Sequence, residues 1–199
     1  MRHVLIATLL ATALTPMAAH ADSPAAADAA ALSQLRGTYA SPAVEAWYGG
    51  YGTREFIFAD RQWQLIFTHA LDPQMVLRTF QFRTGGAYRI GAAHATVPSA
   101  FEADFDEEWK HLTLLTNDPQ VIAGLGLADC ALTPNLETDI SATGCGPWPS
   151  VADCGTDHDL LALDASGLRF GERPADNDMC SPDRRPDALL QPVVALTTP

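Results

Sequence analysis

Several patterns on which common protein classes depend are absent from this sequence of 199 residues. Beyond the N-terminus, no apolar run approaches the ~20 residues that cross a membrane. The four cysteines include no closely spaced pair of the kind that binds zinc. Basic residues number only 12 against 24 acidic ones, and so acidic a surface repels phosphate backbones and anionic membranes. We therefore expect no nucleic acid partner and no stable membrane insertion.

Motifs for catalysis and for cofactors are also missing. GxSxG, HExxH, GxGxxG and a P-loop do not occur. A role in acid–base chemistry would require a histidine beside a carboxylate in a cleft, with His111 and His158 as the candidates. The acidic residues between Asp104 and Glu108, and the pair Asp176 and Asp178, lack the spacing of a calcium loop. We expect solvated acidic surface there, no metal, no cofactor, no catalytic residue and no enzyme activity.

The first 21 residues have the layout of a cleavable secretory signal. Arg2 precedes an apolar run over residues 4–14, and small residues flank the expected cleavage site before Asp22. We expect a secreted protein, periplasmic if the source is a Gram-negative bacterium. Residues 22–34 form an Ala-rich leader or a short helix, residues 35–190 a single domain, and residues 191–199 a tail that is either an edge strand or loose.

Four cysteines in an oxidising compartment predict two disulfides, for which three pairings are possible. A hairpin is expected over residues 158–172, with its turn near Ser166. Cys154 and Cys180 lie 12 and 14 residues from that turn, so they return to nearly the same level of the hairpin. We therefore favour Cys154 with Cys180 and Cys130 with Cys145. The first bridge would hold residues 167–186, which have too few apolar side chains to pack by themselves.

The centre of the sequence alternates between apolar and polar residues in short, aromatic-rich segments, as antiparallel strands do. This predicts an all-β fold, an antiparallel lipocalin-like barrel or half-barrel of about eight to ten strands with one or two short helices. A turn is expected at residues 84–86, and a helix that Asp118 caps and Pro119 begins. The expected strands include residues 37–41, 44–49, 53–60, 61–69, 76–83, 86–93, 101–105 and 109–116.

One face of this sheet is expected to carry aromatic rings that meet in the barrel interior. The rings either fill the core or line a pocket for a lipid or another apolar ligand. Arg54 and Arg78 are in register with them, and each guanidinium could meet a ligand carboxylate or pair with a neighbour such as Glu45. The candidate pocket residues, besides the two arginines, are Phe56, Phe58, Trp63, Leu65, Phe67, Phe80, Phe82 and Tyr88.

Several of these segments carry a resemblance to a known family. The motif RPADNDMC followed by PDRRP, together with LRGTYAS, TGGAYRIG and VPSAFEADF, resembles bacterial members of the adenomatosis polyposis coli down-regulated domain family over about residues 35–189. Animal members of that family look like extracellular Wnt antagonists with barrel-like antiparallel sheets and an apolar pocket. The resemblance implies the same fold and a pocket in this chain, and no Wnt partner in a bacterium.

Two functions of different classes follow. The leading hypothesis is a secreted binding protein that holds an apolar small molecule or lipid in the barrel. The alternative is a protein-interaction or inhibitor module with a filled core, in which exposed loops around Trp148 and the C-terminal segment contact a protein partner.

Overall fold

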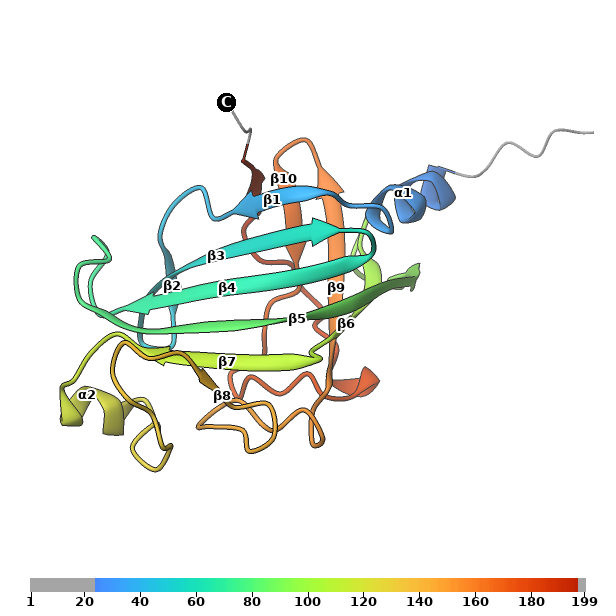
Figure 1. The fold of residues 1–199 in the computed structure, drawn as a ribbon. Coiled ribbons are helices and arrows are strands. Elements are labelled where there is room, and N and C mark those ends of the chain that lie inside the picture. The colour runs from blue at the N-terminus through green and yellow to red at the C-terminus, as the bar shows by residue number, and fades with distance from the viewer. Residues whose placement is uncertain (1–23, 197–199) are drawn as a thin grey trace, which may run out of the picture.

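The computed structural model describes residues 24–196, which fold into a nearly closed barrel of eleven antiparallel strands with two short α-helices (Figure 1). The expected all-β barrel is confirmed, with slightly more strands than the sequence indicated. The expected signal sequence, residues 1–21, lies outside the described residues. The elements are α1 (Pro24–Leu32), β1 (Gly37–Ala40), β2 (Glu45–Trp47), β3 (Gly50–Ala59), β4 (Gln62–Ala70), β5 (Arg78–Ala93), β6 (Phe101–Asp106), β7 (Trp109–Leu114), α2 (Pro119–Gly124), β8 (Thr138–Asp139), β9 (Thr156–Asp164), β10 (Gly167–Phe170) and β11 (Val194–Ala195).

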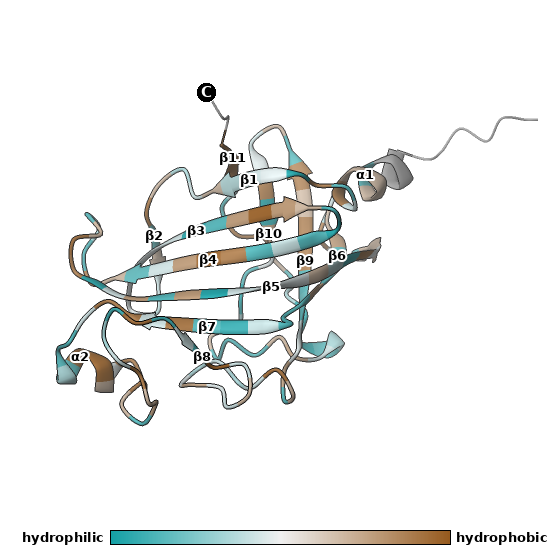
Figure 2. Cartoon of the chain, in the orientation of Figure 1, coloured by the Kyte–Doolittle hydropathy of each residue, from teal (hydrophilic) through white to brown (hydrophobic). Residues whose placement is uncertain are grey.

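Strands β3 and β4 form the hairpin that the alternation predicted. Phe58 pairs with Trp63 across a tight turn, in which Asp60 and Arg61 both have positive φ, as two-residue hairpin turns require. Along β3 the buried and partly exposed residues alternate, and hydrophobic and hydrophilic bands are visible along β3 and β4 (Figure 2). Period-two patterning therefore places one face of the hairpin inside the barrel.

Strand β5 differs from the expectation of two strands with a turn at residues 84–86. It is one strand of 16 residues, whose first half pairs with β7 and whose second half pairs with β6. A Cβ atom on Gly85 would lie 2.6 Å from the Trp63 carbonyl oxygen, and one on Gly86 would overlap the Asp106 carbonyl. The glycines are there because neighbouring backbone comes close as β5 changes partners, and not because the chain turns.

The C-terminal segment closes the barrel. Strand β11 pairs with β1, and Val193 bridges Leu168 on β10 through two backbone hydrogen bonds. The described part of the tail is thus an edge strand, one of the two alternatives that the sequence left open. Because β10 and β1 are the first and second-last strands in the sheet order, this short segment joins the two ends of the sheet.

Both expected helices form, one at each end of the barrel (Figure 1). Leu32, the last residue of α1, and Leu35, just beyond it, are buried in the core. The Tyr88 hydroxyl donates to the Leu32 carbonyl and accepts from the Leu35 amide. Asp118 caps α2 as predicted, since its carboxylate accepts from the amides of the first helical turn. Neither helix is long and apolar enough to cross a membrane.

The two disulfides have the predicted pairing. Cys130 bonds to Cys145 and Cys154 bonds to Cys180, which indicates that the chain matures in an oxidising compartment. The second bridge fastens residues 172–190, which we call the flap, to the start of β9. Arg185 in the flap donates to the carbonyls of Ala103 and Asp159 and to the carboxylate of Asp104. A disulfide and an arginine therefore hold a segment with few apolar side chains.

Candidate functional site

A cavity of about 120 Å³, partly open to solvent, lies inside the barrel between its wall and the flap. It separates two apolar clusters, one that includes Phe56 and Phe105 and a second that includes Phe67 and Trp148. Leu65 on β4 contacts both clusters. Rings from both clusters line the cavity, Phe56 and Phe105 from the first and Phe67 and Trp148 from the second.

Six of the ten residues predicted from the sequence line this cavity: Arg54, Phe56, Trp63, Leu65, Phe67 and Phe82. Three others are buried in the surrounding core and do not reach it. Phe58 and Tyr88 pack against each other in the first cluster, and Phe80 packs between His69 and Trp148 in the second. These three rings support the cavity from behind.

The tenth residue, Arg78, is exposed and lies outside the cavity. A β-bulge explains the difference, because His69 pairs with Phe80 while Ala70 pairs with Arg78, which leaves Thr79 as an extra residue on β5. A bulge breaks the alternation of faces along a strand. Counting by twos from Phe80 therefore assigns Arg78 to the wrong face.

Arg54 is buried and bound by other parts of the protein, so it is not a free cation. It is 4% exposed, and its guanidinium donates two hydrogen bonds of 2.9 Å to the Glu45 carboxylate and a third to the Gln191 carbonyl. The pairing with Glu45 is the one considered from the sequence. It joins β2, β3 and the segment after the flap.

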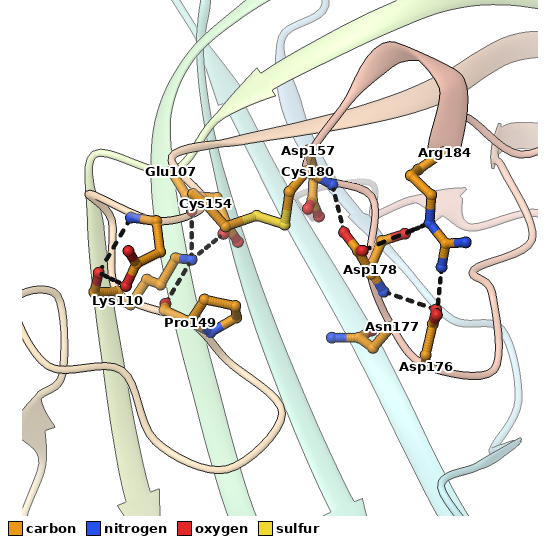
Figure 3. Close-up of a disulfide and its surroundings, with 12 residues drawn as sticks. Glu107, Lys110, Pro149, Cys154, Asp157, Asp176, Asn177, Asp178, Cys180 and Arg184 are labelled. Atoms are coloured by element: carbon orange, nitrogen blue, oxygen red, sulfur yellow. Dashed lines mark hydrogen bonds and ion pairs between the residues drawn. A yellow bond between two sulfur atoms is a disulfide. The ribbon is translucent and has the colours of Figure 1, made fainter.

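The cavity is also lined by charged side chains, none of which except Arg54 was expected there from the sequence. Lys110, the only lysine in the chain, is 1% exposed. Its Nζ lies 2.8 Å from Glu107 Oε2 and donates to the carbonyls of Pro149 and Cys154 at 3.0 and 2.7 Å (Figure 3). The three ammonium protons thus have three acceptors, which leaves this cation no capacity for a ligand.

A second group of charges ties the flap to β9 at the cavity. Arg173 donates to the Asp157 carboxylate at 2.7 Å and to the Asn177 side-chain oxygen at 2.7 Å. The same oxygen accepts from the Tyr48 hydroxyl at 2.8 Å. Tyr48 and Asn177 both have positive φ, so each is held in a turn that presents its side chain to this network.

Asp159 on β9 is the most isolated of the cavity carboxylates. Its Oδ1 accepts from the amides of Leu160 and Gly171, and a Cβ on Gly171 would lie 2.5 Å from that oxygen, so only glycine permits this approach. Burial raises the pKa of Asp159 from 3.8 to about 7. Burial also raises the pKa of Glu107, with Asp157 acting in the same direction.

The pKa of Asp159 makes stability depend on pH. Between about pH 4 and about pH 7 the folded state keeps this proton and the unfolded state releases it, so the free energy of unfolding falls as pH rises. Asp159→Asn removes this contribution, and we expect the variant to gain stability relative to the native protein across that range. Urea unfolding at several pH values tests this, and parallel profiles for the two proteins would contradict it.

The acidic surface expected from the sequence is only partly found. Asp104 and Asp106 are bound by arginines at the barrel surface, Arg185 and Arg89 respectively, whereas Glu107 is buried in the cavity wall. The two candidate histidines do lie beside carboxylates, His111 with Glu137 and His158 with Asp104. Neither histidine lines the cavity.

The position of Trp148 also differs from the expectation. It was expected on an exposed loop, but it is buried and stacks on Phe82 with ring centroids 4.7 Å apart. The loop carrying it makes a tight turn, in which the backbone amides and carbonyls of Cys145 and Trp148 hydrogen-bond to each other. It therefore contributes to the cavity wall and not to an outer contact surface.

Some signals for the missed residues were present. Glu107 is in phase with Phe105, and Lys110 is in phase with Leu112, so strict alternation places both side chains inside. Their charge argued for the opposite face. Arg173 and Asn177 lie in a segment without periodicity, and nothing in the sequence pattern places them at the barrel.

The arrangement can bind a small molecule that has two chemically different parts. Rings on β3, β4 and β5 offer an apolar surface, while carboxylates from the turn after β6, from β9 and from the flap offer hydrogen-bond acceptors. No family model matches the chain, and no curated protein matches it either.

Proposed function

We propose that the protein is a lipocalin-like binding protein that holds a small ligand with an apolar body in the barrel cavity. The observation that carries this proposal is the apolar lining of the cavity. Phe56, Trp63, Leu65 and Phe67 border open space as well as packing against other side chains. A core filled by its own side chains would leave no such space. A rigid barrel that presents rings to a partly open cavity is a common design for small-molecule sites.

The size of the cavity limits the ligand. At about 120 Å³ it is close to the ~150 Å³ of an apolar cavity that holds benzene. A single ring or a short alkyl chain fits without rearrangement. A long acyl chain would require the flap or the inner side chains to move.

Two further features support a protein that acts outside the cytoplasm. The disulfides Cys130–Cys145 and Cys154–Cys180 are those of an oxidising compartment, and residues 1–21 have the layout of a secretory signal. We propose secretion, to the periplasm in a Gram-negative source. Membership of the adenomatosis polyposis coli down-regulated domain family is part of the same proposal, since that family is expected to combine a barrel with an apolar pocket.

A cavity-filling substitution tests the function. Leu65 lies between the two apolar clusters at the cavity wall, so Leu65→Trp should occupy the space and weaken binding of 2-phenylethanol by about tenfold or more. Isothermal titration calorimetry measures the affinity. The matched control is Leu163→Trp, which adds the same volume at an exposed position of β9 and should leave the affinity unchanged.

Native mass spectrometry of protein purified from its own host provides the complementary measurement, because a bound ligand adds a defined mass. If the native protein carries no small molecule and binds neither 2-phenylethanol nor hexanol, the proposal is wrong. The protein-interaction module would then be the better account.

A further inference from the structure

The polar side of the cavity has more acidic than basic groups. Five carboxylates and three cations line it, and two of the carboxylates, Asp176 and Asp178, pair with Arg184, which does not line the cavity. Each negative charge that lacks a positive partner makes the cavity less favourable for an anion and more favourable for a cation. The acidic residues are Glu107, Asp157, Asp159, Asp176 and Asp178, and the basic ones are Arg54, Lys110 and Arg173.

Each of the three cations is already neutralised by the protein. Arg173 is paired with Asp157, and Lys110 is saturated by Glu107 and two carbonyls. Arg54 is paired with Glu45, and its Nη1, which has no partner among the described residues, is fully enclosed. The guanidinium carbon lies 5.6 and 5.9 Å from the ring centroids of Trp47 and Phe56. Arg173 keeps 23% of its side chain exposed, but its charge is already offset by Asp157. A ligand carboxylate therefore finds no cation that lacks a carboxylate partner.

Asp159 is in the opposite position. It is 5% exposed and lines the cavity, yet within residues 24–196 its Oδ2 has neither a hydrogen bond nor an ion pair. Within that range, Arg54 Nη1 is the only side-chain N or O atom that is both fully enclosed and without a partner. Asp159 Oδ2 also has no partner, so it is not fully enclosed and retains accessible surface. The residue lines the cavity, and we take this surface to face it. Arg173 influences Asp159 only from beyond ion-pair distance, and Asp157 adds negative charge.

The aromatic wall suits a cation as well as an apolar group. Trp63 and Trp148 line the cavity, as does Trp47, whose ring already lies near the Arg54 guanidinium. The face of an indole ring attracts a desolvated ammonium group. A buried carboxylate together with aromatic faces is the chemistry that recognises organic amines. The same surroundings penalise a carboxylate, which would meet like charges in a site that is largely dry.

Building on the proposed function, we propose that the cavity selects a cationic amine, a ligand in which an ammonium group is attached to an aromatic ring or a short alkyl chain. The ammonium nitrogen donates to Asp159 Oδ2, and the apolar part lies against the rings of β3 and β4. Free carboxylic acids of the same size are excluded. The proposed ligand is therefore positively charged, whereas a role for Arg54 in carboxylate binding would require a negatively charged one.

Three probes of nearly equal size test the charge preference: 2-phenylethylamine, 2-phenylethanol and phenylacetate. We expect calorimetry with the disulfide-bonded protein at about pH 8 to give an affinity for the amine about tenfold above that for the alcohol, with the carboxylate weakest. The order needs no variant. Phenylacetate binding as tightly as the amine would overturn the inference while leaving the proposed function in place.

Asp159→Asn tests the residue. The asparagine side-chain oxygen still accepts from the amides of Leu160 and Gly171, so the backbone arrangement is retained. Affinity for the amine should fall about tenfold, whereas affinity for the uncharged alcohol should fall much less. Asp60→Asn is the control, because Asp60 is an exposed turn residue with positive φ that asparagine also tolerates. An equal loss for amine and alcohol would refute the role of Asp159, and no binding of any probe to the native protein would refute the proposed function as well.

Discussion

Lys110→Met is expected to lower the free energy of unfolding by about 3–5 kcal/mol, the usual cost of removing one partner of a buried ion pair. The methionine fills similar volume but donates nothing, so the carbonyls of Pro149 and Cys154 lose their donor. Glu107 loses the cation that lies 2.8 Å away and is left as an uncompensated acid. The expected loss is large because burial, and not the number of contacts, sets the cost of each unpaired group.

Urea unfolding at about pH 7 measures this loss. The double variant Lys110→Met, Glu107→Gln should recover part of it, because no buried charge then remains unpaired. Arg89→Met is the matched control, since Arg89 pairs with Asp106 at the surface and is largely exposed. The control should lose about 1 kcal/mol or less. An equally small loss for Lys110→Met would mean that Lys110 reaches solvent.

Replacing both Cys154 and Cys180 with serine is expected to cost about 3.5 kcal/mol, from the loop-closure entropy of a bridge that spans 26 residues. The loss should also have a local consequence. Lys110 donates to the Cys154 carbonyl, and Cys180 lies in the flap above it (Figure 3). Releasing the flap therefore exposes a lysine that is otherwise inaccessible.

Two measurements separate the global and local effects. Urea unfolding gives the overall loss, which should be nearly the same for the Cys130→Ser, Cys145→Ser control, whose bridge spans 15 residues and is worth about 3 kcal/mol. Acylation by an amine-reactive reagent reports on Lys110, the only lysine in the chain. We expect faster labelling of Lys110 in the flap variant alone, and equal labelling in both variants would argue against a flap that covers the cavity.

The parts of the fold that were predictable depend on local or pairwise rules. Alternation identified β3 and β4 because one face of a barrel wall must be apolar. Asp118 followed by Pro119 marked the start of α2 because both residues suit a helix N-terminus. The disulfides followed from the position of Cys154 and Cys180 relative to one hairpin, which is a short-range argument.

The failures have one cause, which is that tertiary partners override local preference. Gly85 and Gly86 suggest a turn in the sequence, but they serve the crossing of β5 between two partner strands. Arg78 is displaced by a bulge that no local pattern announces. Glu107 and Lys110 fit inward positions, yet charged residues are rarely buried, and each is stabilised inside only by the other and by distant carbonyls.

The pairing of the four cysteines also bears on how the chain matures. Each bridge joins cysteines that are neighbours in sequence order, the first with the second and the third with the fourth. When such a polypeptide emerges from its N-terminus into an oxidising space, an oxidase that links thiols in order of appearance produces the native connectivity directly. The native connectivity can therefore form without an isomerase that reshuffles mismatched disulfides.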